Sequence, residues 1–309
     1  MTERTAAASA QPGGERMLAG IGWMLLTTLL FVSVTVTVRY VGTDLPAVEA
    51  AFIRYAIGLL LIAPAFRPLL AGLPPRALMG RFLFRGLVHG IAVMLWFYAM
   101  ARIPIAEVTA LGYTAPIFVT IGAAIFFGER LHMRRIAAVL AGFLGALVIL
   151  RPGFQQISSG QLAQLVAAPL FAASFLIAKG LTRTVSPSLI VAMLSLVCTL
   201  VLLPGALLNW RNPDGTEILL LALTAGFATA GHYTLTRAFH AAPLTVTQPV
   251  GFVQLVWAAA LGMVLFDETP DPWVFLGGAI VVGAVTYISH REAAAARRLR
   301  TPPPPALKS

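Results

Sequence analysis

Residues 104–129 read PIAEVTALGYTAPIFVTIGAAIFFGE, and residues 243–268 read PLTVTQPVGFVQLVWAAALGMVLFDE. The two stretches share one frame, displaced by 139 positions (104 to 243), in which a proline opens each stretch and a glutamate closes it. The first stretch has no charged residue from Val108 to Gly128, so it can cross a bilayer as one helix. A hydrophobic helix that is used twice in one chain predicts a duplicated membrane protein.

The composition of the chain supports this prediction. Charged residues make up 11% of its 309 residues and hydrophobic residues 58%, whereas a soluble domain carries about 25% charged residues because its surface faces water. Only a lipid-facing surface can absorb such an apolar excess. The net charge of +10 does not indicate a nucleic-acid partner, because the arginines form short clusters between apolar runs. The single cysteine, Cys198, excludes disulfides within the chain and cysteine-based metal sites.

Ten apolar segments follow one another along the chain, five in each half. The sequence therefore predicts an all-α polytopic membrane protein with ten transmembrane helices. The expected spans cover residues 17–38, 46–64, 86–101, 104–129, 136–150, 161–178, 187–204, 218–236, 243–268 and 273–289. Residues 1–16 are small and polar, and residues 291–309 are basic and then Pro-rich, so both are expected to be cytoplasmic tails without a fold of their own.

The expected repeats cover residues 17–151 and 160–290, and Arg39 at the end of the first span matches Lys179 at the end of the sixth. An odd number of helices per repeat forces the two copies into opposite orientations, which predicts two inverted five-helix repeats. Basic residues gather on the cytoplasmic side of membrane proteins. This rule predicts a bacterial-type inner-membrane protein with both termini cytoplasmic. The outer connections then hold only these basic residues: Arg39, Arg102, Arg151 and Arg211.

Arg54 is the clearest candidate for a site residue, because it lies about two turns inside the second span. A charge at such depth costs about 3 kcal/mol or more, so it faces the bundle interior or a wet cavity. Arg54 either contacts the solute or a gate, or it is a packing residue paired with Glu49 or with helix carbonyls. Glu49 and Glu107 are candidates for proton coupling, and an ion pair with Arg102 at the membrane surface is the alternative for Glu107.

Polar and aromatic side chains at helical spacing indicate where a planar or polar organic solute would bind. In the fourth span Thr109, Tyr113 and Thr120 share one helical face, and Gln248 and Phe252 are counterparts of this face in the ninth span. The alternative is that such residues only pack helices together. The complete set of substrate-binding or gating candidates is Arg54, His89, Trp96, Thr109, Tyr113, Thr120, His232, Tyr233, Gln248, Phe252, Gln254 and Trp257.

His89 and His232 lie within spans, and each is either a hydrogen-bonded interior histidine or part of a proton relay. Neither has a second ligand three or four residues away, so no metal is expected. The polar surroundings of His232 indicate a solvated cavity. The sequence has no phosphate-binding loop and no nucleophile elbow, so we expect neither an enzyme nor a cofactor.

The segment WFYAMARIPIAEVTALGYTAPIFVTIGAAIFFGERLHMRRIAAVLAGFLGALVILRPG, residues 96–153, resembles an EamA-type repeat of the drug/metabolite transporter superfamily. The shared marks are Pro104, the mid-helix Pro116 and the terminal Gly128-Glu129 pair. The second copy has Leu255 in place of Pro116, so a kink in both halves does not follow. The resemblance implies a secondary transporter that works by alternating access between its two halves.

Two shorter stretches, RIPIAEVTALGYTAPIFVTI and HYTLTRAFHAAP, are most similar to a bacterial branch of this superfamily that includes riboflavin and S-adenosylmethionine uptake carriers. The resemblance therefore implies uptake of a riboflavin- or S-adenosylmethionine-like solute. Exporters of amino acids or drug-like metabolites share the same frame and are the alternative. A membrane sensor or assembly partner that transports nothing is the alternative of another class. Expected partners are a small-molecule substrate and the lipid bilayer, with proton coupling and a homodimer left open.

Overall fold

The computed structural model describes residues 14–63, 76–127, 133–181, 184–185, 187–241, 247, 250–269 and 271–300. Secondary structure in these residues is helical, apart from one isolated bridge between Pro152 and Gln155. The helices are α1 (Gly14–Val41), α2 (Ala47–Leu61), α3 (Arg76–Met100), α4 (Ile105–Gly112), α5 (Ala115–Phe127), α6 (Met133–Leu150), α7 (Ser159–Leu181), α8 (Pro187–Leu208), α9 (Gly215–Ala241), α11 (Val253–Phe266) and α12 (Pro272–Arg300).

Several of these helices match the dimensions of a bilayer. Five stretches are long and apolar enough to cross a membrane: Met17–Val41, Leu78–Met100, Ser159–Ala178, Leu189–Leu208 and Gly215–Leu235. Shorter apolar stretches are Ile105–Val119, Val139–Leu150, Val253–Phe266 and Pro272–Tyr287. The predicted all-α class with several apolar spans is confirmed.

The first repeated stretch is not one helix, contrary to the prediction. α4 ends at Gly112, and a turn at Tyr113 and Thr114 separates it from α5. Pro116 explains the break, because it has no N–H to donate to the carbonyl of Gly112 and its ring clashes with that carbonyl. The chain instead tightens into a short turn, in which Thr114 N–H donates to Leu111 O at 3.1 Å.

Two other boundaries also differ from the prediction. α3 begins at Arg76 rather than at Gly86, so part of the expected polar connection is helical. Its arginines are tolerated there because one of them, Arg85, is buried against α8 and donates to Ile190 O at 2.9 Å. α12 continues to Arg300, because the tail begins with an Ala- and Arg-rich run of strong helix formers.

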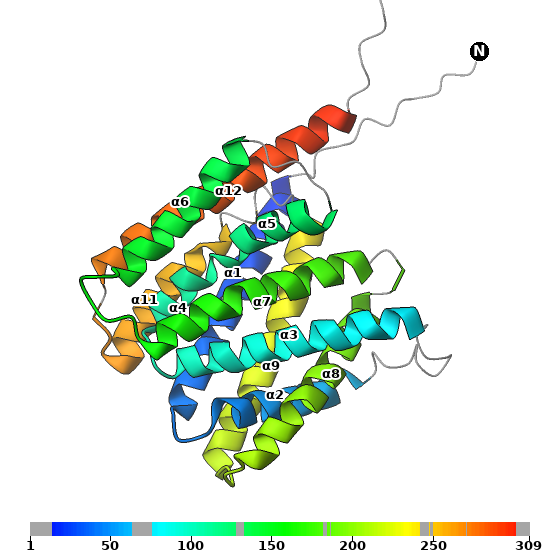
Figure 1. Cartoon of the computed structure of the whole chain (residues 1–309), viewed down its shortest axis with the longest axis vertical. Coiled ribbons are helices and arrows are strands. Elements are labelled where there is room, and N and C mark those ends of the chain that lie inside the picture. Colours follow the sequence, from blue (N-terminus) through cyan, green and yellow to red (C-terminus); the bar gives the residue numbers. More distant parts are fainter. Residues whose placement is uncertain are drawn as a thin grey trace, which may run out of the picture.

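Helices from the first half of the chain pack along helices from the second half. α1 lies along α9, α3 along α7, α2 along α8 and α6 along α12 (Figure 1). Two threonine pairs join α1 to α9: the hydroxyl oxygens of Thr27 and Thr234 are 2.8 Å apart, and those of Thr37 and Thr224 are 2.7 Å apart. The two halves are therefore interleaved rather than separate.

α6 and α12 approach so closely that their backbones touch. A Cβ atom on Gly145 would lie 2.7 Å from Gly277 O, and one on Gly277 would lie 2.5 Å from Gly145 O. Small residues at such crossings let two membrane helices pack through their backbones. The glycines of these two helices therefore fix this interface.

One end of the bundle collects acidic residues and is called the acidic end here. It contains the connecting segments 42–46, 101–104, 151–158, 209–214 and 267–269 with Asp271, together with the helix turns next to them. Several of its acids lie in first turns of helices, where the helix dipole favours negative charge. The acidic residues at this end are Asp44, Glu49, Glu107, Asp214, Glu217, Asp267, Glu268 and Asp271.

Candidate functional site

Three basic candidates lie on helices that pack together: Arg54 on α2, His89 on α3 and His232 on α9. These helices converge because α2 packs against both α3 and α9. The charge of Arg54 is near enough to influence both imidazoles. We call these three residues the central cluster. The structure thus brings together three residues that the sequence analysis selected one at a time.

Arg54 lies half-buried beside an aromatic ring and keeps unused hydrogen-bonding capacity. Its Cζ atom is 4.5 Å from the ring centroid of Tyr55, and its buried Nε has no hydrogen-bond partner among the described residues. The alternative pairing of Arg54 with Glu49 does not occur, because Glu49 is fully buried and accepts from the Arg211 backbone N–H at 3.0 Å. Buried donors nearly always have partners, so Arg54 is suited to bind a solute.

Aromatic rings flank the central cluster on two sides. Phe171 of α7 meets His89 edge-to-face at 5.1 Å between centroids, and Phe31 of α1 meets His232 in the same way at 5.3 Å. Trp96 extends this surface, because its ring lies 6.0 Å from that of Phe171. The His232 side chain is exposed, so the cluster is accessible from one side.

The two phenylalanines occupy equivalent positions in the two halves of the chain. Phe31 and Phe171 are separated by 140 positions (31 to 171), the same offset that relates Arg39 to Lys179. Counting eight positions back from Arg39 and from Lys179 would have found both rings, but the sequence analysis did not select them. Each half therefore contributes one aromatic ring that contacts a histidine, and the site has approximate two-fold character.

A hydrogen bond fixes one of the two imidazoles. His89 Nδ1 lies 3.0 Å from the hydroxyl of Ser174 on α7, which joins α3 to its partner helix beside the cluster. Such a bond orients the imidazole ring. His89 therefore presents its remaining nitrogen in a defined direction.

The turn after α4 lies next to the residue that precedes α11. Tyr113 follows α4, and Phe252, its counterpart by the 139-position offset (113 to 252), directly precedes α11. Their rings meet edge-to-face at 5.1 Å. The Gln164 side chain on α7 lies against Gly112 beside this turn, and its oxygen is buried without a hydrogen-bond partner in the described residues. Since such atoms seek a partner, this contact region can accept a polar group of a solute or a water molecule.

The other candidates lie apart from these two places. The Thr109 hydroxyl is buried and donates to Ile105 O at 2.9 Å, so it serves its own helix. Tyr233 is 59% exposed on α9 and Trp257 is 36% exposed on α11, and the structure does not bring either into the cluster. Gln254 is half-buried on α11. Two candidates, Gln248 and the side chain of Thr120, lie outside the described residues.

Glu107 lies at the acidic end and is not part of the central cluster. Its side-chain oxygen accepts from Gln161 Nε2 of α7 at 2.5 Å. The alternative ion pair of Glu107 with Arg102 does not form, because Arg102 places its Cζ 3.6 Å from the ring centroid of Tyr98. Together with Glu49, Glu107 therefore belongs to the contacts that hold this end of the bundle together.

A comparison with known protein families identifies the family to which this chain belongs. The model of the EamA-like transporter family matches residues 18–151 and again residues 158–290. The chain belongs to this family. As an EamA-like transporter it is embedded in a membrane and handles a small molecule. The repeated match agrees with the two stretches that share one frame.

Relatives of this EamA-like chain are similar over nearly their whole lengths. A riboflavin transporter of Vibrio cholerae is 33% identical over 288 residues, covering 92% of this chain and 97% of the relative. An S-adenosylmethionine uptake transporter of Rickettsia felis is 27% identical, covering 91% and 96%. A pseudopaline exporter of Pseudomonas aeruginosa is 29% identical, covering 90% and 98%. A crystal structure at 20% identity has a TM-score of 0.58 and covers 90% of this chain and 98% of its own, which supports the fold alone.

Proposed function

We propose that this chain is a secondary active transporter that takes up a flavin-like solute across the inner membrane by alternating access. The observation that carries the proposal is the central cluster, in which α2 with Arg54 packs against α3 and α9, and the rings of Phe171 and Phe31 contact His89 and His232 on those helices. The 33% identity to a riboflavin transporter agrees with it. Because the cluster draws on helices from both halves, a solute bound there lies between the parts that must rearrange.

The chemistry of the cluster suits a planar ring system with carbonyl groups. The isoalloxazine ring of a flavin is flat, and it carries carbonyl oxygens and an imide N–H along one edge. Phe31, Phe171 and Trp96 supply aromatic surface, Arg54 supplies N–H donors for the carbonyls, and an imidazole can serve the imide. A few directed polar groups in an aromatic pocket are typical of small-molecule sites.

The charges around the cluster do not suit S-adenosylmethionine, which carries a positive sulfonium. Among the described residues, each Asp or Glu lies at the acidic end, near the start of α1 or in the last part of α12. A second positive charge about 5 Å from Arg54 would cost about 3 kcal/mol at an effective dielectric constant near 20. A neutral or anionic solute avoids this repulsion.

The proposal includes ten spans arranged as two inverted repeats. In this arrangement α1, α3 and α5 are the counterparts of α7, α9 and α11. When counterparts are exchanged, the α1–α9 interface becomes the α7–α3 interface, and the α5–α7 contact becomes the α11–α1 contact. All four contacts are present in the structure. A packing pattern that survives this exchange supports a two-fold relation between the halves. The acidic end, poor in basic residues, would face outward and both termini would face the cytoplasm.

Flavin uptake tests the proposal directly. Labelled riboflavin should accumulate in bacterial cells that lack their own flavin carriers and express this chain, and excess S-adenosylmethionine should not compete. Arg54→Gln should lower the uptake at least about tenfold, because a charge-assisted hydrogen bond is worth about 1.5–3 kcal/mol. Arg102→Gln is the matched control, since Arg102 lies at the acidic end, and it should leave uptake unchanged.

Failure of the chain to accumulate flavin above empty cells would count against the proposal. Equal uptake by Arg54→Gln and the wild type, at equal amounts of membrane protein, would remove Arg54 from the site. An uncoupler added to the same assay decides whether a proton gradient drives the uptake.

Export is the second candidate, because a pseudopaline exporter is 29% identical over nearly the whole chain. Arg54 would also bind a carboxylate well, since a guanidinium matches two oxygens at once. Inside-out vesicles distinguish the two directions. A carboxylate-bearing metabolite that accumulates in them, with no flavin entering right-side-out vesicles, would favour export.

A further inference from the structure

At the acidic end, several polar contacts of charged side chains connect the first half of the chain to the second half. Arg39 pairs with Glu268 at 3.2 Å, Gln161 donates to Glu107 at 2.5 Å, Arg151 pairs with Asp271 at 2.5 Å, and the Arg211 N–H donates to Glu49 at 3.0 Å. They come from different helices, so they close this end as a ring rather than at one point.

Glu268 is the residue of this ring with contacts to the most segments. Its Oε2 accepts from the backbone N–H of Ile105 at the start of α4 at 2.9 Å, and its Oε1 pairs with Arg39 at the end of α1. Arg39 reaches further and donates to Ile103 O at 3.0 Å. One carboxylate therefore connects α1, α4 and the segment after α11. The side chains of Arg39 and Glu268 are 21% and 11% exposed, so solvent screens this pair only partly.

The local backbone places Glu268 in this position. Asp267 adopts the left-handed conformation (φ 52°) that ends α11, and Glu268 N–H then donates back to Gly262 O at 3.1 Å. Gly262 leaves room for the folded-back side chain, because a Cβ atom there would lie 2.5 Å from Glu268 Oε2. The turn after α11 therefore aims Glu268 at the start of α4.

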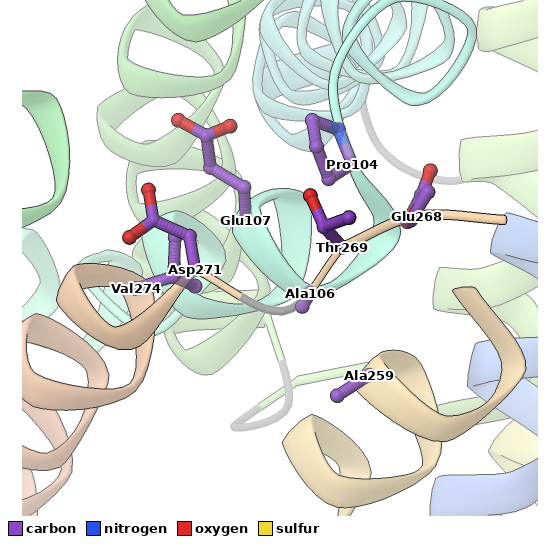
Figure 2. A pocket seen from close by; sticks show the side chains of 8 residues that line it. All are labelled: Pro104, Ala106, Glu107, Ala259, Glu268, Thr269, Asp271 and Val274. Atoms are coloured by element: carbon purple, nitrogen blue, oxygen red, sulfur yellow. The ribbon is translucent and has the colours of Figure 1, made fainter. Parts of the chain in front are cut away.

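A cavity of about 60 Å³ lies directly beside these contacts (Figure 2). In Figure 2, Glu107 approaches it from α4, Glu268 and Thr269 from the segment after α11, and Asp271 from the start of α12. A ligand pocket for an organic solute usually has about 300–1,000 Å³, so this space holds water but no flavin. In this structure the cavity therefore offers no passage for a solute between α4, α11 and α12.

We infer that the pair of Glu268 with Arg39 and the start of α4 is the latch of the outer gate. This inference rests on the proposed transport function, in which the acidic end must open to admit the solute. To open it, α1 and α4 have to separate from the segment after α11, and Glu268 is the side chain that holds all three. Weakening this side chain shifts the population toward the outward-open state.

Accessibility of a buried cysteine tests the latch without any solute. Ala259 is 8% exposed and lines the cavity below Glu268, so Ala259→Cys in a Cys198→Ala background serves as the reporter. Right-side-out vesicles are treated with a membrane-impermeant thiol reagent. Glu268→Gln and Arg39→Gln should each raise the labelling rate roughly fivefold. The double variant should label at about the same rate as each single variant, because the two substitutions remove the same contact.

The control is Asp267→Asn, which removes one acid from the same turn. Asp267 is exposed, no side-chain contact is found for it among the described residues, and asparagine also tolerates its left-handed backbone. Its labelling rate should equal that of the reporter alone. If Glu268→Gln inserts poorly, Arg39→Gln alone decides the outcome, because it weakens the latch from the other side.

Unchanged labelling in Glu268→Gln and Arg39→Gln overturns the latch, and so does an equal rise in Asp267→Asn. Faster labelling only in inside-out vesicles also overturns it, since the acidic end would then face the cytoplasm. Because the reporter needs no solute, the expected labelling without flavin uptake would keep the latch and reject the proposed substrate. Flavin uptake with unchanged labelling would reject the latch and keep the proposed substrate.

Discussion

At the scale of single residues, the two phenylalanines beside the central cluster are equivalent in sequence and in contact. Phe31 and Phe171 each meet one histidine edge-to-face, with interplanar angles of 74° in both pairs. Their histidines are less regular, because His89 and His232 are 143 positions apart (89 to 232), about one helical turn away from the offset of the repeated stretches. The two halves thus make the same kind of ring contact, although the two histidines do not occupy equivalent positions in the sequence.

Replacing these rings tests whether both line one site. Phe31→Leu and Phe171→Leu should each raise the KM for flavin uptake about threefold to tenfold, because an aromatic pair is worth about 0.5–1.5 kcal/mol beyond its buried area. The maximal rate should change little. Phe175→Leu, one turn further on α7 and 52% exposed, is the control. A change in KM from only one of the two rings would contradict a shared site.

At the scale of elements, the break after α4 depends on more than its proline. Pro169 lies inside α7 and Pro204 inside α8, yet both helices continue through them. The difference lies four residues before each proline: Gly112 precedes Pro116, whereas a leucine precedes each of the others. Glycine adds its own entropic cost to the lost hydrogen bond, so of these three described proline sites the one at Pro116 divides into two helices.

Pro116→Ala should rejoin α4 and α5. The substitution restores an N–H for Gly112 O and removes a clash, which together are worth about 3 kcal/mol in a helix. We expect the thermal midpoint in detergent to stay or rise while flavin uptake falls about tenfold, because the Tyr113 turn would be lost. Pro204→Ala, in a helix that is already continuous, should leave uptake unchanged. Normal uptake by Pro116→Ala would show that the turn has no role in transport.

Hydrophobic runs were enough to predict most helices and the all-α class. The start of α3 was not predicted, because arginines such as Arg81 and Arg85 in a short stretch look like a connection when their burial is unknown. Arg54, His89 and His232 could be selected because ionisable residues within spans are costly. Their meeting could not be predicted, since it depends on α2 packing against α9 from the other half, and hydrophobic periodicity carries no such information.

At the scale of the whole molecule, the two halves do not form two lobes. α1 lacks a long partner in its own half and lies along α9, just as α3 lies along α7 (Figure 1). In the proposed alternating-access mechanism, a rigid movement of one half against the other would have to break these interfaces. The moving bodies should instead be pairs such as α1 with α9, held by the threonine contacts, and α3 with α7.

The interleaving predicts that neither half is stable alone. A fragment of residues 1–155 should be degraded in cells, because α1, α3 and α6 would expose the surfaces that α9, α7 and α12 cover in the full chain. Coexpression with residues 156–309 should restore both fragments to the membrane, as measured by immunoblot and copurification. A stable fragment 1–155 without its partner would contradict an interleaved core.

The threonine contacts between α1 and α9 can form only after most of the chain has been synthesised. Thr27 and Thr234 are 207 residues apart, and ribosomes add about 5–20 residues per second, so Thr27 waits roughly 10–40 s for its partner. During that time α1 has left the ribosome while α9 is still being made. Its hydroxyls can meanwhile bond only to carbonyls of their own helix, as Thr27 does with Trp23 O at 2.8 Å. α1 therefore spends this interval without the helix that covers its threonines in the full chain.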